Sequence, residues 1–166
     1  VELAAAGDVD LVVELIGGTG DPAAALIDSA LAAGKSVVTA NKALLAGRAM
    51  QLAVVSEASG ASLAYEAAVA GGIPVIKTLR EALAGNKMNR ISGILNGTCN
   101  FILSQMESNG VSFEEALKEA QKLGFAEAEP DLDISGMDAA QKLALLAGLA
   151  FGVQPDVSQI SVTGIE

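Results

Sequence analysis

Three short apolar segments near the N-terminus have the pattern of β-strands. Residues 9–16 (VDLVVELI) form a nearly continuous run rich in β-branched side chains, which predicts a parallel strand covered on both faces. Residues 36–40 (SVVTA) and 62–66 (SLAYE) predict two further strands. Helical segments separate them, and this alternation predicts a doubly wound α/β unit, in which ligands bind at the carboxyl ends of the strands.

The helical segments between these strands carry recognisable start and stop signals. Asp21 is expected to cap the first helix, with Pro22 in its first turn and Gly34 at its carboxyl end. The second helix is expected over residues 41–59, with an interruption near Gly47.

The sequence pattern changes after Glu66. Residues 67–74 (AAVAGGIP) are small and flexible, so we place a domain junction here and divide the chain into residues 1–66 and 67–166. A capping box is expected at Ser112 and Glu115. The remaining expected elements are helices over 73–84, 98–108, 112–123 and 136–151, a strand over 89–95, an acidic loop over 124–135 and a strand-like segment over 155–166.

Composition and charge remove several classes of function. The chain has 166 residues, 51% of them hydrophobic, and its 20 acidic and 10 basic side chains give a net charge of −10. Because nucleic acids are bound largely by clustered cations, we expect no nucleic-acid partner. The first residues lack the pattern of a signal peptide, and no apolar run is long enough to span a membrane, so we expect no membrane partner.

The absence of histidine restricts the possible chemistry. With no His in the sequence, acid–base catalysis has to use Lys, Asp, Glu or Tyr65. The single cysteine, Cys99, excludes an internal disulfide and is compatible with a reducing cytosol. With no His partner, Cys99 is interpreted as a structural thiol.

Polar groups at two predicted strand ends could bind a ligand. The glycine-rich loop Gly17–Gly20 could let a nucleotide approach the backbone, although turn glycines are also common in ordinary loops. Lys42, after Thr39–Asn41, could offer an ammonium group to a cofactor or a polarised oxygen, or could simply be a solvated lysine in a first helical turn.

Two further segments allow both a functional and a structural interpretation. Glu66 and the glycine-rich residues after it could bind a hard cation through oxygen ligands, or form an interdomain hinge. The turn Asn96–Asn100 could present amides and a hydroxyl to a small polar ligand, or serve only as a turn and helix cap.

The strongest cluster lies around an acidic loop. Glu127, Glu129, Asp131 and Asp133 precede Asp138 and Lys142, which are spaced i, i+4 and therefore leave the same face of a helix. A surface ion pair would explain this spacing, but the flanking residues 139–151 are almost entirely apolar. We therefore expect Lys142 to be partly buried, where it could give or take a proton.

Five sequence blocks together resemble homoserine dehydrogenase. The resemblance covers essentially the whole chain, because the blocks match that family in order and spacing. They are VELIGG (13–18), GKSVVTANKALLA (34–46), YEAAVAGGIP (65–74), ILNGTCNFIL (94–103) and AEAEPDLDISGMDAAQKLALLA (126–147).

The resemblance implies a fold and an activity. It implies the second half of a doubly wound NAD(P)-binding α/β domain over residues 1–66, followed by a partial α+β catalytic and dimerisation domain over 67–166. The implied reaction is the interconversion of L-homoserine and L-aspartate 4-semialdehyde, a step toward threonine and methionine. It also implies a homodimer in the cytoplasm.

The resemblance assigns roles to individual residues. Lys142 looks like the lysine that exchanges a proton with the substrate hydroxyl, with Asp138 holding it. Glu127 is similar to the acceptor of the substrate amino group. By the same resemblance, the substrate pocket would be completed by Asp133, Gly97 and Thr98, and the cofactor side would be lined by Lys42, Gly18, Thr19 and Ala40. A monovalent cation, Na⁺ or K⁺, would be bound by Glu66 with the carbonyls of Val69, Gly71 and Ile73.

The sequence departs from the family pattern in two places. Glu129 stands where the family usually has Asp, which keeps the charge. No G-x-G-x-x-G turn occurs, so this polypeptide alone is expected to bind a dinucleotide poorly, and the choice between NAD and NADP stays open. Two alternatives remain: a related amino-acid or semialdehyde dehydrogenase, and a non-catalytic dimerisation or small-molecule-binding module of the same fold.

Overall fold

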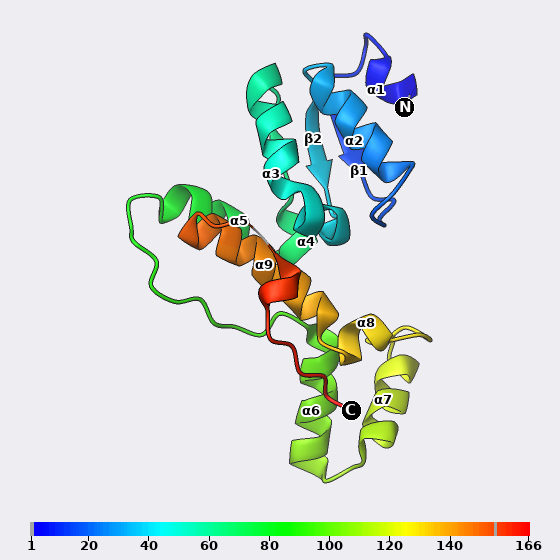
Figure 1. The fold of residues 1–166 in the computed structure, drawn as a ribbon. Coiled ribbons are helices and arrows are strands. Elements are labelled where there is room, and N and C mark those ends of the chain that lie inside the picture. Colours follow the sequence, from blue (N-terminus) through cyan, green and yellow to red (C-terminus); the bar gives the residue numbers. More distant parts are fainter. Residues whose placement is uncertain (1, 155) are drawn as a thin grey trace.

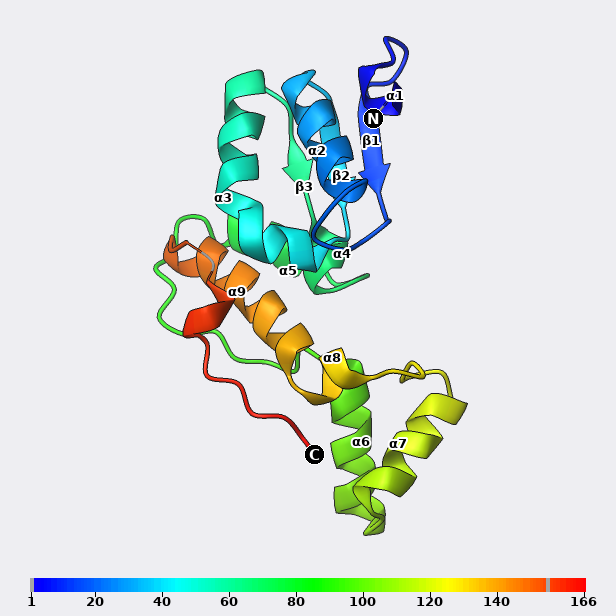
Figure 2. The ribbon, with the colours of Figure 1, turned by 45° about the vertical axis from the view of Figure 1, so that its right-hand side comes forward.

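Three parallel strands form a sheet in the N-terminal half of the chain (Figures 1 and 2). The computed structural model describes residues 2–154 and 156–166. The strand β1 (Leu11–Glu14) pairs with β2 (Ser36–Thr39), and β2 pairs with β3 (Leu63–Ala64). The carboxyl ends of the strands point toward the middle of the molecule, where the predicted ligand-binding edge lies. The α/β class predicted from the sequence is confirmed.

Two helices pack on each other and on one face of this sheet. In α2 (Ala23–Ala32), the side chain of Asp21 accepts a hydrogen bond from the N–H of Ala25, and Gly34 follows the helix with a φ of 73°. The helix α3 (Lys42–Ser59) runs straight through Gly47, so the predicted interruption there is wrong. A glycine costs a helix only about 1 kcal/mol relative to alanine, which the burial of leucines on α3 offsets.

The first strand is covered on one face only. Val12 and Glu14 are buried, whereas Leu11 and Val13 are 51% and 55% exposed. The prediction that this strand is covered on both faces is therefore wrong for the described residues. The reason is that the two helices packed on the sheet, α2 and α3, lie on the same side of it.

The second half of the chain is helical in the described residues. The helices α6 (Gly97–Asn109) and α7 (Phe113–Lys122) form a hairpin, and the capping box predicted at Ser112 and Glu115 is present.

The remaining helices and turns of the described residues are shorter, apart from α9. They are α1 (Glu2–Ala5), α4 (Glu66–Val69), α5 (Val75–Lys77), a π-helical turn η1 (Thr78–Ala82), α8 (Asp131–Ile134), α9 (Met137–Phe151) and a 3₁₀ turn η2 (Val157–Gln159).

Two predicted strands and a predicted loop differ in the structure. Residues 89–95 are irregular, and the segment 156–166 forms only the turn η2, while Pro155 lies outside the described residues. A strand needs a hydrogen-bonded neighbour, and β1, β2 and β3 are the strands that the described part of the chain forms. The expected acidic loop 124–135 contains the short helix α8.

Helix α9 lies between the two halves of the molecule (Figures 1 and 2). Its Leu145 and Leu146 belong to the hydrophobic core that β1, β2, α2 and α3 also form, whereas a second core cluster lies among α6, α7 and α8. Its first turn therefore lies where the two units meet. Within the described ranges, no helix combines the length and apolar character needed to cross a membrane.

The C-terminal segment is fixed against the start of α9. Ile165 donates its N–H to the carbonyl of Ile134, and Gly136 has a φ of 82°. A Cβ at Gly136 would lie 2.9 Å from a methyl carbon of Val162. Glycine therefore allows both the left-handed backbone and the close approach of the last residues.

Candidate functional site

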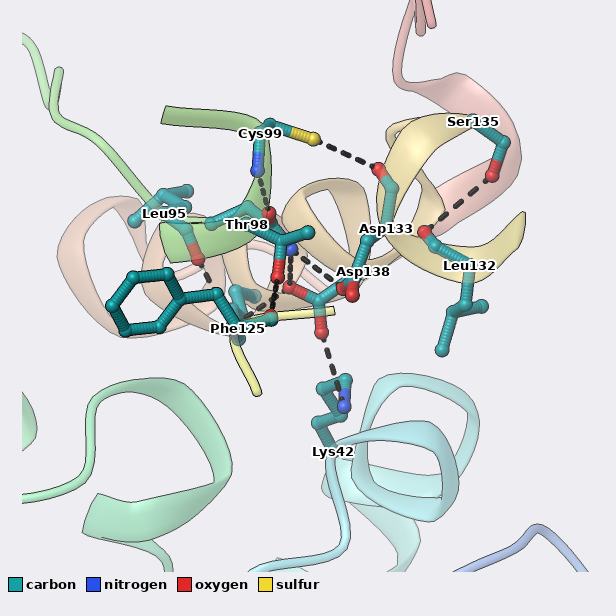
Figure 3. Close-up of polar contacts among 11 residues, drawn as sticks. Lys42, Leu95, Thr98, Cys99, Phe125, Leu132, Asp133, Ser135 and Asp138 are labelled. Atoms are coloured by element: carbon teal, nitrogen blue, oxygen red, sulfur yellow. Dashed lines mark hydrogen bonds and ion pairs between the residues drawn. The ribbon is translucent and has the colours of Figure 1, made fainter. Parts of the chain in front are cut away.

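The carboxylate of Asp138 is the centre of a buried polar cluster (Figure 3). Asp138 lies in the first turn of α9, and its side chain is 5% exposed. Its Oδ2 accepts a hydrogen bond of 2.7 Å from Nζ of Lys142, one turn later on the same helix. Its Oδ1 lies 3.0 Å from Nζ of Lys42, the first residue of α3. One carboxylate thus joins α3, which packs on the sheet of the N-terminal half, to α9 in the helical second half of the chain.

A side-chain amide holds this carboxylate from another direction. Nδ2 of Asn96 donates to Oδ2 of Asp138 at 2.9 Å and to Oδ1 of Asp133 at 2.7 Å. Its Oδ1 accepts the N–H of Cys99 at 2.8 Å and so caps helix α6. Asn96 therefore connects the starts of α6, α8 and α9.

The surroundings of Asp138 keep it ionised. Burial raises the pKa of a carboxyl group, but hydrogen bonds from Lys142, Asn96 and Lys42 outweigh burial, so the pKa of Asp138 lies below its ordinary value of 3.8. The side chain of Lys142 is 19% exposed, and its Nζ also donates to the carbonyl of Leu95 at 3.0 Å. The predicted partial burial of Lys142 is confirmed.

An open cavity of about 580 Å³ lies beside this cluster. The hydroxyl of Thr98 donates to the carbonyl of Phe125 at 2.6 Å and fixes one wall. The cavity combines charged groups with an aromatic surface, as a polar small molecule requires. Its lining residues include Asn96, Gly97, Thr98, Phe125, Asp133, Asp138 and Lys142.

The remaining predicted carboxylates lie outside the cluster. Glu127, Glu129 and Asp131 are exposed. Among the described residues, Glu127 forms no ion pair with Lys142 or Lys42 within 4.0 Å. Of the four carboxylates that precede Asp138, only Asp133 lines the cavity beside Lys142.

The thiol of Cys99 is bonded within the same region. Its Sγ donates to the carbonyl oxygen of Asp133 at 3.2 Å. Burial and the negative charges of Asp133 and Asp138 raise the pKa of this thiol. The thiol therefore stays protonated near neutral pH, which agrees with the interpretation of Cys99 as a structural residue.

A second polar network shapes the loops at the carboxyl edge of the sheet. Oε1 of the buried Glu14 accepts the N–H groups of Ile16 and Gly17, and its Oε2 accepts the hydroxyl of Thr39 at 2.5 Å. Burial raises the pKa of Glu14, but these hydrogen bonds lower it below its ordinary value of 4.5. Nδ2 of Asn41 donates to the carbonyl of Gly18 at 2.7 Å. These bonds fix the loop next to Lys42.

The residues predicted for the cofactor side lie at this edge. Gly17 and Gly18 have φ values of 82° and 81°, which glycine adopts without strain, and no atom lies within 4 Å of a Cβ built on either. Thr19 follows in the same exposed loop, and Ala40 comes directly after β2, two residues before Lys42. The open backbone fits the approach of a phosphate or a sugar.

The predicted cation site has a partly different role in the structure. Oε1 and Oε2 of Glu66 accept the N–H groups of Ile76 and Lys77 at 2.7 and 3.0 Å, so this carboxylate holds the start of α5. The carbonyl of Ile73 accepts the N–H of Val75. Among the described residues, no cluster of three or more His, Cys, Asp or Glu side chains could hold a metal ion. A cation here would have to be held mainly by backbone carbonyls.

Two residues that organise the site are not predicted as such from the sequence. The sequence places Asn96 in a polar turn but does not predict its bonds to two carboxylates. Glu14 lies in a predicted strand, and its one signal is an acidic residue at the end of an otherwise apolar strand, because a buried carboxylate requires hydrogen-bond partners.

Family models match both halves of the chain. The model described as "Homoserine dehydrogenase" matches residues 74–166, and the model described as "Homoserine dehydrogenase, NAD binding domain" matches residues 1–66. Together they leave only residues 67–73 unmatched.

Curated relatives match the chain over nearly its full length. A homoserine dehydrogenase of Neisseria gonorrhoeae is 50% identical over 99% of this chain and 38% of its own length. One of Bacillus subtilis is 47% identical over 95% of this chain and 36% of its own length. The chain thus spans little more than a third of these relatives.

Solved structures agree with the architecture. A homoserine dehydrogenase from Thiobacillus denitrificans superposes with a TM-score of 0.91 and 50% identity, covering 95% of this chain and 36% of that one. A hyperthermophilic archaeal homoserine dehydrogenase in complex with NADPH has a TM-score of 0.80 and 34% identity, covering 88% of this chain and 45% of its own.

Proposed function

Because this chain belongs to the homoserine dehydrogenase family, we propose that the complete protein carrying it interconverts L-homoserine and L-aspartate 4-semialdehyde with NAD(P). The observation that carries the proposal is the Lys142–Asp138–Lys42 cluster beside an open polar cavity. It joins a proton-transferring amine to the edge of a parallel sheet, where nucleotides bind in this type of fold.

The proposed mechanism assigns one step to each group. In its neutral amine form, Nζ of Lys142 takes the hydroxyl proton when homoserine is oxidised and becomes an ammonium; in the reverse direction that ammonium returns the proton. Asp138 holds that amine in place. Glu127 receives the substrate ammonium, which requires its exposed loop to turn toward the cavity, while Asp133, Gly97 and Thr98 contact the rest of the substrate.

The cofactor side is proposed for the N-terminal unit, residues 1–66. A nicotinamide dinucleotide, when bound, accepts or supplies the hydride equivalent. Gly18, Thr19 and Ala40 would lie along it, and Lys42 would reach the reacting oxygen from its position at Asp138. The fit rests on the open glycine backbone and on the Glu14 network that holds it. Residues 67–166 form the proposed catalytic and dimerisation domain.

The test is substrate-dependent reduction of NAD⁺ or NADP⁺ by the purified complete protein. We expect L-homoserine to be oxidised and L-serine, one methylene shorter, to be a poor substrate, because its hydroxyl does not reach Lys142 when its ammonium is bound. If L-homoserine leads to reduction of neither NAD⁺ nor NADP⁺, the enzymatic proposal is refuted and a binding module is favoured. Equal rates with both amino alcohols would favour a related dehydrogenase.

We also propose a monovalent cation, Na⁺ or K⁺, bound by Glu66 and the carbonyls of Val69, Gly71 and Ile73. Each Glu66 oxygen accepts a single backbone N–H and retains a lone pair for a cation. The left-handed Gly72, with a φ of 76°, turns the backbone in this segment.

This site predicts activity that depends on the identity of the cation. At constant ionic strength, replacing choline chloride by KCl or NaCl is expected to raise the rate. Glu66→Gln should require more cation for half-maximal activation, because one charged ligand is lost. Glu57→Gln, on the exposed face of α3, is the matched control. A rate that is indifferent to the cation would rule the site out.

We further propose a homodimer and a cytoplasmic location for the complete protein. Exposed apolar side chains in the second half of the chain, including Leu103 and Phe151 at 46% and 44%, support a surface that another chain covers. The cytoplasmic location follows from the biosynthetic reaction proposed.

A further inference from the structure

We infer that Asn96 is a positioning residue whose side-chain amide holds Asp138 in the orientation in which both carboxylate oxygens face lysines. The inference rests on the proposed function, because it concerns the same proton-transferring cluster. Asn96 is only 9% exposed, and both ends of its amide are bonded.

The orientation of the amide is fixed by helix α6. A backbone N–H can only donate, so the Asn96 atom 2.8 Å from the N–H of Cys99 has to be the oxygen. The NH₂ group is thereby directed to the other side. Its two hydrogens match its two acceptors, Oδ1 of Asp133 and Oδ2 of Asp138. The capping hydrogen bond of α6 therefore determines that the NH₂ group of Asn96 faces the carboxylates of Asp133 and Asp138.

This donor restricts the rotation of the Asp138 carboxylate. Oδ2 receives both Asn96 and Lys142, at 2.9 and 2.7 Å, which leaves Oδ1 free to face Lys42 at 3.0 Å. Without the amide, Asp133 and Asp138 would be two negative groups with no donor between them. Asp138 could then rotate away, and the amine of Lys142 would lose its fixed position.

The charges around the amide make its effect dependent on pH. A carboxylate in place of the amide would add negative charge and favour the protonated form of every titratable neighbour. A shorter neutral side chain, which cannot donate to both carboxylates as the amide does, would raise the pKa of Asp138, because the hydrogen bond from Asn96 lowers it. The titratable groups that face Asn96 are Lys42 from α3, Cys99 from α6, Asp133 from α8, and Asp138 and Lys142 from α9.

The experiment compares three variants of the complete protein. Asn96→Ser keeps an oxygen to cap α6 but replaces the NH₂ group, which donates to two carboxylates, with a shorter hydroxyl that can donate only one hydrogen bond. Asn96→Asp keeps the cap and the shape but replaces the donor by a charge. Asn109→Ser is the control, because Asn109 lies exposed at the other end of the same helix and bonds only Gln105 among the described residues. For Asn96→Ser we expect kcat to fall about 10- to 100-fold, as for small misplacements of reacting groups, with KM for homoserine nearly unchanged. For Asn96→Asp we expect a further loss and a kcat/KM profile displaced to higher pH.

An activity-independent measurement separates this inference from the proposed function. Acid unfolding of Asn96→Ser should have its midpoint at higher pH than that of the unmodified protein, even if the protein oxidises no homoserine. The inference is overturned if the acid midpoint is unchanged. It is also overturned if kcat is kept in both Asn96 variants of an active protein, or if only KM changes, since Asn96 would then bind substrate directly.

Discussion

Replacing Lys142 by alanine is expected to lower kcat for homoserine oxidation by about 10² to 10⁴-fold, the usual contribution of a positioned acid or base. Lys142 supplies the amine that both lines the cavity and bonds Asp138. KM should change little, because the amine acts on the reacting hydroxyl and the ammonium of the substrate is held elsewhere. Steady-state kinetics on the complete protein measure both parameters.

Two further variants make this result specific. Lys77→Ala removes an equally charged side chain that is 69% exposed and pairs only loosely with Glu81, so its kinetics should match those of the unmodified protein. Glu127→Gln should instead raise KM and leave kcat largely intact, because it weakens the binding of the substrate ammonium.

Chemical rescue tests the assignment of the amine itself. Alanine at position 142 leaves space beside the cavity, so added methylamine should restore part of kcat in Lys142→Ala. Retention of more than about a tenth of kcat without added amine would contradict a proton-transfer role for Lys142.

The local elements of the fold were predictable because their signals lie within a few residues. The capping box at Ser112 and Glu115 and the N-terminal strand-helix alternation depend on neighbours in sequence, and the structure confirms them. The failures depend on distant partners. Residues 89–95 have the composition of a strand, but composition does not specify which strand lies beside it. Exposure of one face of β1 likewise depends on which helices pack there.

The same distinction applies to the site. The i, i+4 spacing of Asp138 and Lys142 predicts that their side chains leave the same helix face, and in the structure they form an ion pair there. The contact of Lys42 with Asp138 joins segments far apart in sequence, so no spacing rule indicates it. The bonds of Asn96 were missed for the same reason, since a turn asparagine has the same sequence signal whether or not its amide meets two carboxylates.

The buried carboxylate of Asp138 has a second expected consequence, on stability. Asp138→Asn leaves two lysines facing a neutral amide, and breaking a buried ion pair from one side costs about 3 to 5 kcal/mol. We expect a loss near 3 kcal/mol, at the lower end, because the side chains of Lys142 and Lys42 are 19% and 29% exposed and can reach water. The midpoint of urea unfolding near neutral pH measures this loss.

A matched control separates burial from charge alone. Asp28→Asn breaks the ion pair with Arg48, whose partners are 45% and 32% exposed. Surface pairs of this kind contribute about 0.2 to 1 kcal/mol, so this variant should unfold close to the unmodified protein. Equal losses in the two variants would show that burial of Asp138 has no special role.

The pH dependence of the unfolding free energy tests whether the charge of Asp138 stabilises the folded state. Because the folded pKa of Asp138 lies below 3.8, folding favours its ionised form. Its contribution is complete above the ordinary pKa of 3.8 and is lost as the pH falls through the lower folded value. The difference in unfolding free energy between the protein and Asp138→Asn should therefore be constant near neutral pH and shrink below 3.8. A difference that does not shrink in acid would mean that the amide disturbs packing and that the charge of Asp138 contributes nothing.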